Sequence, residues 1–344
     1  MIYTGIDVSS KSFVVYAVNN KKKKIFDNEI KPTPEGLKEL MKELGPEKKY
    51  IVFEAGNQMK WICQTLLKMK DVIIHVVHPN EIKWINQSSG KTDKIDARKL
   101  AELARGDLLP RKVHIVEGQT RKLRELASAR NQLQSKRVSL INTIRGYLKQ
   151  EGYGLQEKFF NCEDWKEKLQ RMKISPTLKT IMETFMLGIE GLKESEKMIT
   201  DEFLKISDER IDLIESIPCI GKISSRVIVS AIDDAKRFDS KKCVAKYTSL
   251  TPRIYQSGNV VHMGRIDYNG RREVRKVLLQ CAHTITRTKT LEAKPLKDFF
   301  ERISKKRGKK KAIVALARKL IVVAYGVLKN GSYYDPQELE IKAA

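Results

Sequence analysis

The sequence contains few cysteines, no long apolar run and a shortage of acidic residues. Its five cysteines have none of the short spacings typical of zinc sites or disulfide frameworks, so we expect reduced thiols. The most apolar late stretch, residues 312–328, is interrupted by Arg318 and Lys319 and is too short and too charged to span a bilayer. We expect no signal peptide either, because the first residues run directly into a strand. These absences predict a cytoplasmic protein with no membrane partner.

The shortage of acidic residues leaves a large positive charge. Across 344 residues, Lys and Arg number 67 against 42 Asp and Glu, which gives a net charge of +25. That excess indicates a polyanionic partner, and nucleic acid is the first candidate. A basic run is usually a solvated face, but with this overall charge phosphate contact is the better explanation. The candidate nucleic-acid-binding residues are Arg253, Arg265, Arg271, Arg272, Arg275, Lys305, Lys306, Arg307, Lys309, Lys310 and Lys311.

Residues 1–118 have the element order of a ribonuclease-H-like (RuvC-like) α/β domain. Hydrophobic alternation and turn residues predict three strands, followed by helices that alternate with two more strands. The predicted strands are residues 2–8, 12–18, 25–30, 50–54 and 72–77, and the predicted helices are about 34–44, 59–69, 80–86 and 93–105. Three strands followed by helix, strand, helix, strand and helix is the order of that fold.

Four acidic residues lie where such a fold would bring them together. Asp7 and Glu54 lie at or near the ends of predicted strands, whereas Asp93 and Asp96 share one face of a helix that Thr92 caps. Clustered carboxylates repel one another unless a cation or raised pKa values relieve them. A divalent metal is the usual remedy, and its usual chemistry is hydrolysis or transfer at phosphate. For Asp93 and Asp96 alone, complementing the helix dipole is an equally good explanation.

Residues 119–205 carry two heptad rows, which predict an antiparallel coiled-coil helical hairpin. Arg130 and Arg137 fall on the first seam, which argues against a simple tight zipper and leaves room for a surface that also meets phosphate. Heptads mostly mean packing, so we assign the hairpin to scaffold or oligomer contacts. The first row is Leu126, Leu133, Leu140 and Tyr147 beside Leu123 and Ile144, and the second is Leu178, Phe185, Leu192 and Ile199 with Met182, Ile189 and Phe203.

Residues 206–334 are predicted to form a third, mainly helical domain. Residues 213–229 read as helix, tight turn and helix, which resembles the helix-hairpin-helix element that presents backbone amides to DNA phosphate. Cys219 occupies a position where glycine is usual in such hairpins.

Several segments of the chain resemble insertion-sequence family one-ten, whose transposases are of the DEDD type and are similar to Piv-type DNA invertases. The resemblance covers nearly the whole chain, and its departures are Cys219 and Ser249, both where glycine is usual. Three segments match the RuvC-like domain: Gly5-Ile-Asp-Val-Ser, Glu54-Ala-Gly and Lys91-Thr-Asp-Lys-Ile-Asp-Ala-Arg. Four match the carboxy-terminal transposase domain: Ser216-Ile-Pro-Cys-Ile-Gly, Tyr247-Thr-Ser-Leu-Thr-Pro-Arg, Tyr255-Gln-Ser-Gly and Asn269-Gly-Arg-Arg-Glu-Val-Arg.

The resemblance implies the roles of five residues. Asp7, Glu54, Asp93 and Asp96 become catalytic, Mg²⁺-binding acids, and Ser257 becomes a catalytic serine. Without the resemblance, Ser257 and the following glycine would read as a turn. A serine hydroxyl needs a base or a metal, and the domain around Ser257 offers no obvious base. We therefore expect Ser257 to dock against the carboxylate–metal cluster of the other domain, from the same or another protomer.

The resemblance also implies an activity and its partners. The implied activity is RNA-guided recombination, in which DNA strands are cut and rejoined through a phosphoserine intermediate. Arg253 and either Arg271 or Arg272 would balance the transition-state charge. The implied partners are donor and target DNA, a structured guide (bridge) RNA and further copies of the chain, from dimer to tetramer in the synaptic complex. Such a protein would be associated with the nucleoid when it is bound to DNA.

Three alternatives remain open at this stage. The first is a site-specific DNA invertase that acts without a guide RNA. The second is a metal-dependent junction endonuclease in which Ser257 is merely structural. The third is a nucleic-acid-binding protein without catalytic activity.

Overall fold

The chain forms two compact units in a computed structural model that describes residues 1–82, 92–258, 260–267 and 270–337. Unit 1 is Met1–Ile115 and unit 2 is Val116–Ala344. The first boundary falls close to the predicted end of the RuvC-like domain. The predicted domains, 1–118, 119–205 and 206–334, stay predictions.

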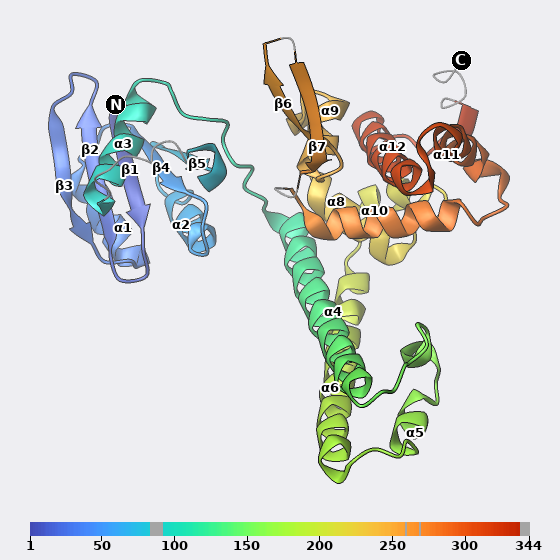
Figure 1. The fold of residues 1–344 in the computed structure, drawn as a ribbon. Coiled ribbons are helices and arrows are strands. Elements are labelled where there is room, and N and C mark those ends of the chain that lie inside the picture. Colours follow the sequence, from blue (N-terminus) through green and yellow to red (C-terminus); the bar gives the residue numbers. More distant parts are fainter. Residues whose placement is uncertain (83–91, 259, 268–269, 338–344) are drawn as a thin grey trace. The chain divides into compact units, whose positions relative to one another are not determined.

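Unit 1 is built on a five-stranded mixed sheet with the strand order β3-β2-β1-β4-β5 (Figure 1). The first three strands are antiparallel neighbours, whereas β4 is parallel to β1 and β5 is parallel to β4. The strands are β1 Ile2–Val8, β2 Phe13–Asn19, β3 Lys24–Ile30, β4 Lys49–Glu54 and β5 Val72–Val77. The helices are α1 Pro34–Glu43, α2 Met59–Leu66 and α3 Asp93–Arg105.

The predicted element order of unit 1 is confirmed. The one exception is the predicted helix 80–86. A 3-10 turn covers Pro79–Glu81 in its place, and residues 83–86 lie outside the described part of the chain.

Both faces of the sheet are covered, which explains why its central strands are nearly continuous apolar runs. Ile6 and Phe53 belong to one core cluster with residues of α1 and α2. On the opposite face, α3 packs directly onto β1 at Gly5, where an added Cβ would come within 2.0 Å of the Ala97 carbonyl oxygen. Any side chain at position 5 would therefore push α3 off the sheet. This close approach fixes where the first turn of α3 lies.

His75 of β5 fastens the segment that follows α3 to the sheet. Its ring is buried, with Nε2 2.9 Å from the Pro110 carbonyl oxygen and Nδ1 2.8 Å from the Tyr50 hydroxyl. A carbonyl oxygen only accepts, so Nε2 carries the proton and Nδ1 accepts from Tyr50. This arrangement requires the neutral ring. Burial lowers the pKa of His75 below its ordinary 6.5, nearby Lys112 lowers it further, and the hydrogen bond to Pro110 opposes the shift.

Acid should weaken this fastening. Because the folded pKa of His75 is depressed, the unfolded chain binds more protons once the pH falls below about 6.5. The stabilisation is therefore fully present above that pH and is lost as the pH falls toward the folded pKa. We expect a histidine ring titration by NMR to give a pKa below 6.5 for His75. Hydrogen exchange of β5 amides, corrected for intrinsic rates, should be faster at pH 5.5 than at pH 7.5.

The Tyr50→Phe variant provides the control for this prediction. It removes the hydroxyl that donates to Nδ1 of the neutral ring, so the pKa of His75 should rise toward its ordinary value. An ordinary pKa for His75 in the unmodified chain would contradict the prediction.

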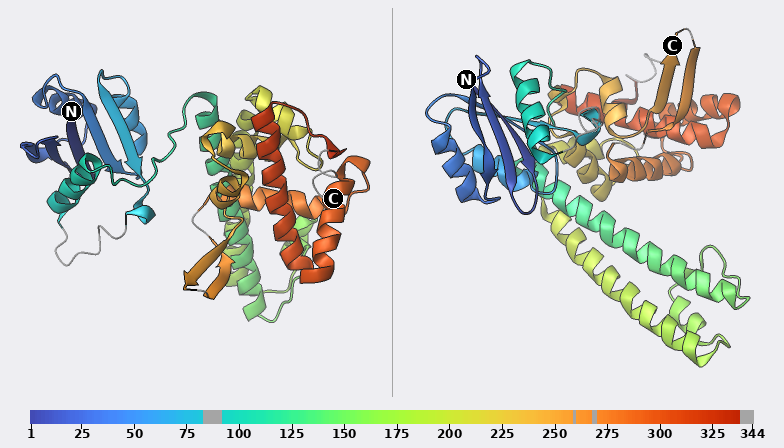
Figure 2. Two further views of the ribbon diagram at one scale, coloured as in Figure 1. Left: turned by 90° about the horizontal axis from the view of Figure 1, so that it is seen from above. Right: turned by 60° about the vertical axis from the view of Figure 1, so that its left-hand side comes forward.

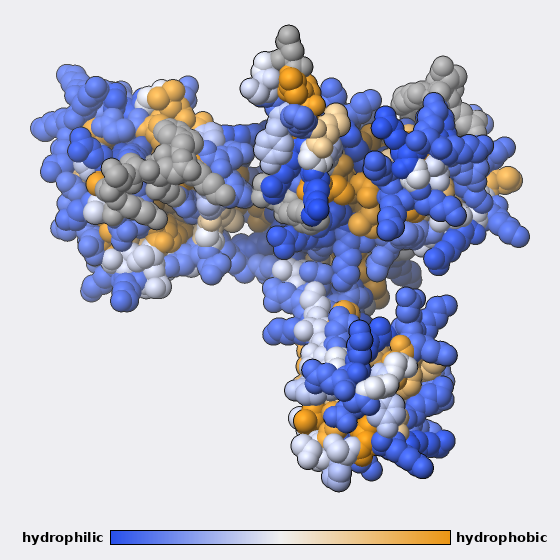
Figure 3. Space-filling view, viewed as in Figure 1, coloured by the Kyte–Doolittle hydropathy of each residue, from blue (hydrophilic) through white to orange (hydrophobic). Residues whose placement is uncertain are grey.

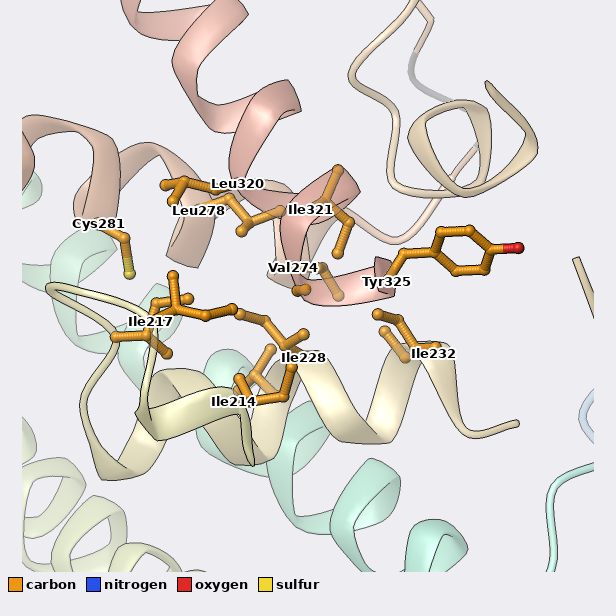
Figure 4. Packing of buried hydrophobic residues seen from close by; sticks show 14 of the residues in the cluster. Ile214, Ile217, Ile228, Ile232, Val274, Leu278, Cys281, Leu320, Ile321 and Tyr325 are labelled. Atoms are coloured by element: carbon orange, nitrogen blue, oxygen red, sulfur yellow. The ribbon is translucent and has the colours of Figure 1, made fainter. Parts of the chain in front are cut away.

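The described residues of unit 2 form a helical body with one β-hairpin. Its core joins residues of α4 and α6 with those of the later helices, and Figure 4 shows Ile228, Leu278 and Ile321 meeting in it. Its helices are α4 Gly118–Gln150, α5 Trp165–Gln170, α6 Pro176–Lys205, α7 Glu209–Glu215, α8 Lys222–Ile232, α9 Lys241–Tyr247, α10 Arg272–Ile285, α11 Lys294–Arg307 and α12 Lys309–Asn330. Its strands are β6 Pro252–Ser257 and β7 Val260–Ile266.

The long helices α4 and α6 lie side by side and form an arm within unit 2 (Figures 1 and 2). Leu123 and Ile144 are buried, whereas the row led by Leu126 is half-buried and ends at Tyr147, which is 38% exposed. The buried seam of α4 therefore differs from the predicted seven-residue row, as a straight helix of 3.6 residues per turn drifts away from such a row. Supercoiling of the two helices stays a prediction.

The segment between α4 and α6 contributes to a hydrophobic cluster. Trp165 and Leu169 of α5 are buried against Leu178 and Met182 of α6 and form a small separate core at the end of the arm.

The two departures from glycine have the backbone geometry that favours glycine. Cys219 has φ 64° in the turn between α7 and α8, and Ser249 has φ 56° just after α9. Both values lie in the left-handed region. At Ser249 the side chain also acts locally, because its Oγ accepts a hydrogen bond from the Gly270 amide at 2.7 Å.

Every helix among the residues that the structure describes is too short or too polar to pass through a bilayer.

Candidate active site

Asp7 and Glu54 lie next to each other at one edge of the unit 1 sheet. The parallel pairing of β1 and β4 ends with Ile6 opposite Phe53, so the following residues, Asp7 and Glu54, end the two strands together. Alternation along a strand puts them on the face opposite to Ile6 and Phe53. That face is the one covered by α3, and both carboxylates are half-buried there.

The first turn of α3 carries the other two acids to the same end of the sheet. Thr92 caps the helix, its Oγ1 accepting from the Ile95 amide at 3.3 Å. Asp93 and Asp96 extend, by one turn, the stripe of α3 that packs on the sheet. That stripe comprises Ala97, Leu100, Ala101 and Ala104. Since Tyr3, near the start of β1, packs with the cluster of Leu100 and Ala104, the beginning of α3 lies toward the end of β1.

The donor set suits a hard divalent cation. Carboxylate oxygens are the ligands that Mg²⁺ prefers. Asp96 Oδ1 is buried and makes no hydrogen bond, an arrangement that is costly unless something positive approaches it. Asp93 is exposed. Within residues 1–82 and 92–115, no three His, Cys, Asp or Glu side chains stand in a geometry that could hold a metal ion, so the acids gather at one edge without forming a complete ligand shell.

Ser257 lies at the tip of the β6–β7 hairpin in unit 2, which the sequence did not predict. It is the last residue of β6, pairs with Val260 and precedes Gly258, whose φ of 56° makes the turn. The serine is exposed, and its hydroxyl has no hydrogen-bond partner among the described residues. Figure 3 shows apolar atoms over this hairpin, where Met263 is 73% exposed. An isolated two-stranded hairpin is marginally stable in water, so contact with a binding partner would stabilise this exposed hairpin.

The hairpin register places a histidine on the same face of the hairpin as Ser257. Tyr255 pairs with His262 and Ser257 with Val260, and paired residues two positions apart share one face. Ser257 and His262 are therefore diagonal neighbours, which are about 7–8 Å apart and within reach of a long side chain. The sequence alone suggested no base for the serine. The signal that was missed is the pair of short strand-forming stretches, Ile254-Tyr255 and Val260-Val261, on either side of Ser257-Gly258.

The predicted nucleic-acid-binding residues form three groups in unit 2. Arg253 and Arg265 are exposed on the hairpin, and Arg253 Nε lies 3.6 Å from Asp267 Oδ1. At the start of α10, Arg271 pairs with Glu273 at 2.5 Å, and its buried Nε makes no hydrogen bond. Arg272 is exposed and Arg275 is half-buried in the same turns of α10. The six lysines and arginines of residues 305–311 are all exposed where α11 ends and α12 begins.

Acids at the edge of a mixed sheet, together with many exposed cations, define an enzyme that acts on nucleic acid. Two family models match the chain. One, described as Transposase (the DEDD type of IS110), matches residues 4–152, and the other, Transposase IS116/IS110/IS902 family, matches residues 211–297. Together they cover well over half of the chain. The chain belongs to the IS110 family of transposases and is a DNA transposase or recombinase enzyme.

Individual relatives agree with this assignment. The chain is 22% identical over 96% of its length to the transposase of insertion sequence IS1111A from Coxiella burnetii, of which it covers 90%. It is 32% identical to the pilin gene-inverting protein of Moraxella bovis over 37% of this chain and 39% of that protein. It is also 21% identical to the transposase of IS1328 from Yersinia enterocolitica over 72% of this chain and 74% of that protein.

Proposed function

We propose that the protein is an RNA-guided DNA recombinase of an insertion sequence, which cuts and rejoins DNA strands through a phosphoserine intermediate. One observation carries the proposal: a chain whose unit 1 gathers carboxylates at a sheet edge also presents a serine hydroxyl, exposed, at the tip of a hairpin in unit 2. A nuclease that uses water as the nucleophile needs the first feature only. The second supplies a nucleophile that stays attached to the DNA.

The chemistry follows from these groups. In the first step Ser257 Oγ attacks a scissile phosphodiester, one bridging P–O bond breaks, and the DNA oxygen leaves as a hydroxyl. His262 accepts the serine proton and returns it to the leaving oxygen. In the second step a hydroxyl of another strand attacks the phosphoserine and the bond between phosphorus and Ser257 Oγ breaks. His262 takes the proton of the attacking hydroxyl and returns it to Ser257 Oγ, which restores the serine and joins the two strands. The energy of the phosphodiester is kept in the serine ester, so rejoining needs no further energy source.

In this proposal the carboxylates act on the scissile phosphate, through a bound metal ion, and not on the DNA bases. Asp7, Glu54 and Asp96, with Asp93, would hold Mg²⁺, and a bound ion would supply positive charge against the phosphate and make the serine hydroxyl more acidic. Arg253 and either Arg271 or Arg272 would balance the charge of the transition state. Because Ser257 belongs to a different unit from the acids, the proposed chemistry would need both units, from one protomer or from two within a synaptic oligomer.

A guide RNA accounts for the charge. A protein that holds donor DNA, target DNA and a structured RNA at once must neutralise many phosphates, which agrees with +25. If RNA guides the enzyme, purification under native conditions should retain one dominant, nuclease-sensitive RNA species. Sequencing of that RNA should find segments complementary to both DNA partners. A protein that purifies without RNA, yet recombines DNA, would exclude guidance.

A site-specific invertase without a guide is the second candidate. The similarity to the pilin gene-inverting protein favours it. Recombination by RNA-free protein on a defined pair of sites would decide for this candidate.

A further inference from the structure

Glu196 of α6 is surrounded by cations where the arm joins the rest of unit 2. Arg130 Nη2 lies 3.1 Å from Glu196 Oε1, and Arg137 Nε lies 3.2 Å from Oε2. Arg130 also donates to Thr200 at 3.0 Å. The two arginines that interrupted the predicted seam of α4 therefore share one carboxylate of α6, and one negative charge balances two positive ones.

Two lysines add to this excess from other positions. Lys276 of α10 donates to the Gln134 side chain of α4 at 2.6 Å. Burial lowers the pKa of Lys276, as do Arg130 and Arg137, and Glu196 only partly offsets this. Burial likewise lowers the pKa of Lys193 on α6, and Arg137 and Lys166 lower it further. Both ammonium groups are therefore partly desolvated and have other cations beside them.

Two hollows open beside these side chains. One, of about 210 Å³, lies between α4, α8 and α10 and is lined by Arg130, Gln134 and Lys276. The other, of about 310 Å³, lies against α4 and α6 and is lined by Arg137, Lys193 and Lys197. At about 30 Å³ for each water, either hollow has room for a phosphate group. Acidic side chains also line them, Glu273 in the first and Glu196 and Asp201 in the second. Glu273 is paired with Arg271.

Joining α4 to α6 does not explain the surplus of positive charge around Glu196. A single arginine paired with Glu196 would join α4 to α6, whereas further cations in the same place repel one another and lose hydration. An anion entering the hollows would relieve both costs. We propose that Arg130, Arg137, Lys193 and Lys276 form a binding site for the backbone phosphates of a nucleic-acid strand, with Glu196 as the internal counter-ion that the strand displaces. The proposal rests on the proposed function only in taking nucleic acid as the partner.

The test measures equilibrium binding of the full-length protein to a labelled duplex DNA of random sequence and, separately, to an RNA hairpin. Binding is measured without divalent metal at several salt concentrations. Lys276→Gln and Arg137→Gln should each reduce the slope of log K against log salt by about 0.9, which at 0.1 M salt is about eightfold weaker binding. Lys179→Gln, which removes an exposed lysine at the other end of α6, should leave binding unchanged.

Glu196→Gln should act in the opposite direction and tighten binding, because it removes the counter-ion. This variant keeps the test informative even if the loss of a cation disturbs folding. Affinities and slopes equal to those of the unmodified protein in all three cluster variants would overturn the proposal. So would Lys276-dependent binding of inorganic phosphate alone with unchanged nucleic-acid affinity. Comparing the measurement on duplex DNA with that on the RNA hairpin identifies which nucleic acid is bound. Covalent attachment at Ser257 is measured separately, so failure of this site and failure of the proposed chemistry are distinguishable.

Discussion

Ser257→Ala should abolish covalent attachment of the protein to DNA and, with it, strand rejoining. The variant removes the only oxygen to which the proposed mechanism joins phosphate, and an alanine at an exposed hairpin tip costs little stability. We expect adduct formation to fall by at least about a thousandfold, as when other serine nucleophiles are removed. The measurement is denaturing electrophoresis of protein incubated with labelled DNA, Mg²⁺ and the co-purified RNA. The labelled adduct should vanish while equilibrium DNA binding persists.

Two further variants separate chemistry from hairpin structure. Val260→Ala changes the cross-strand partner of Ser257 and should preserve adduct formation. His262→Gln removes the proposed proton acceptor and should slow adduct formation by about a hundredfold. If Ser257→Ala still cut DNA at the normal rate, the protein would be a metal-dependent nuclease. A His262→Gln variant with an unchanged rate of adduct formation would exclude the histidine from the reaction.

Asp7→Asn and Asp96→Asn should each abolish strand cleavage while leaving nucleic-acid binding intact. Each variant keeps the shape of the side chain but removes a charge and a strong oxygen ligand, so we expect cleavage to fall by about a thousandfold or more. Without divalent metal, both variants should be more stable than the unmodified chain, because one of several neighbouring carboxylates no longer repels the rest. Cleavage assays, equilibrium nucleic-acid binding and thermal unfolding in chelator measure the three effects.

Replacement of a carboxylate that only supports the fold would not be expected to raise stability and abolish cleavage together. Glu39→Gln, on the exposed side of α1, removes one charge from unit 1 and should change neither quantity. If Asp7→Asn cleaved and rejoined DNA normally, the acids would not be catalytic. A nucleic-acid-binding role for unit 1 would then be the better explanation.

Unit 1 could be predicted from the sequence because its signals are local. Apolar runs marked the strands, Pro34 and Thr92 marked helix starts, and the observed helix α3 Asp93–Arg105 agrees with the predicted one. The positions of Asp7 and Glu54 at strand ends follow from the same pattern. Their shared edge could be expected as soon as the strand order was known. In unit 2 the local pattern was less informative, because the β6–β7 hairpin is short, exposed and flanked by helices.

The sequence by itself determined the excess of positive charge and the order of the strands and main helices of unit 1, and it predicted the four acids as a site, whereas the role of Ser257 came only from the family resemblance. Only the tertiary structure decided which residues face one another. It put α3 onto β1 through the missing side chain of Gly5, brought His262 to the face of Ser257, and gave Glu196 two arginine partners. The physical reason is that hydrophobic period and capping act within a few residues, whereas strand register and ion pairing join positions far apart in the chain. Those contacts depend on packing, which no local pattern encodes.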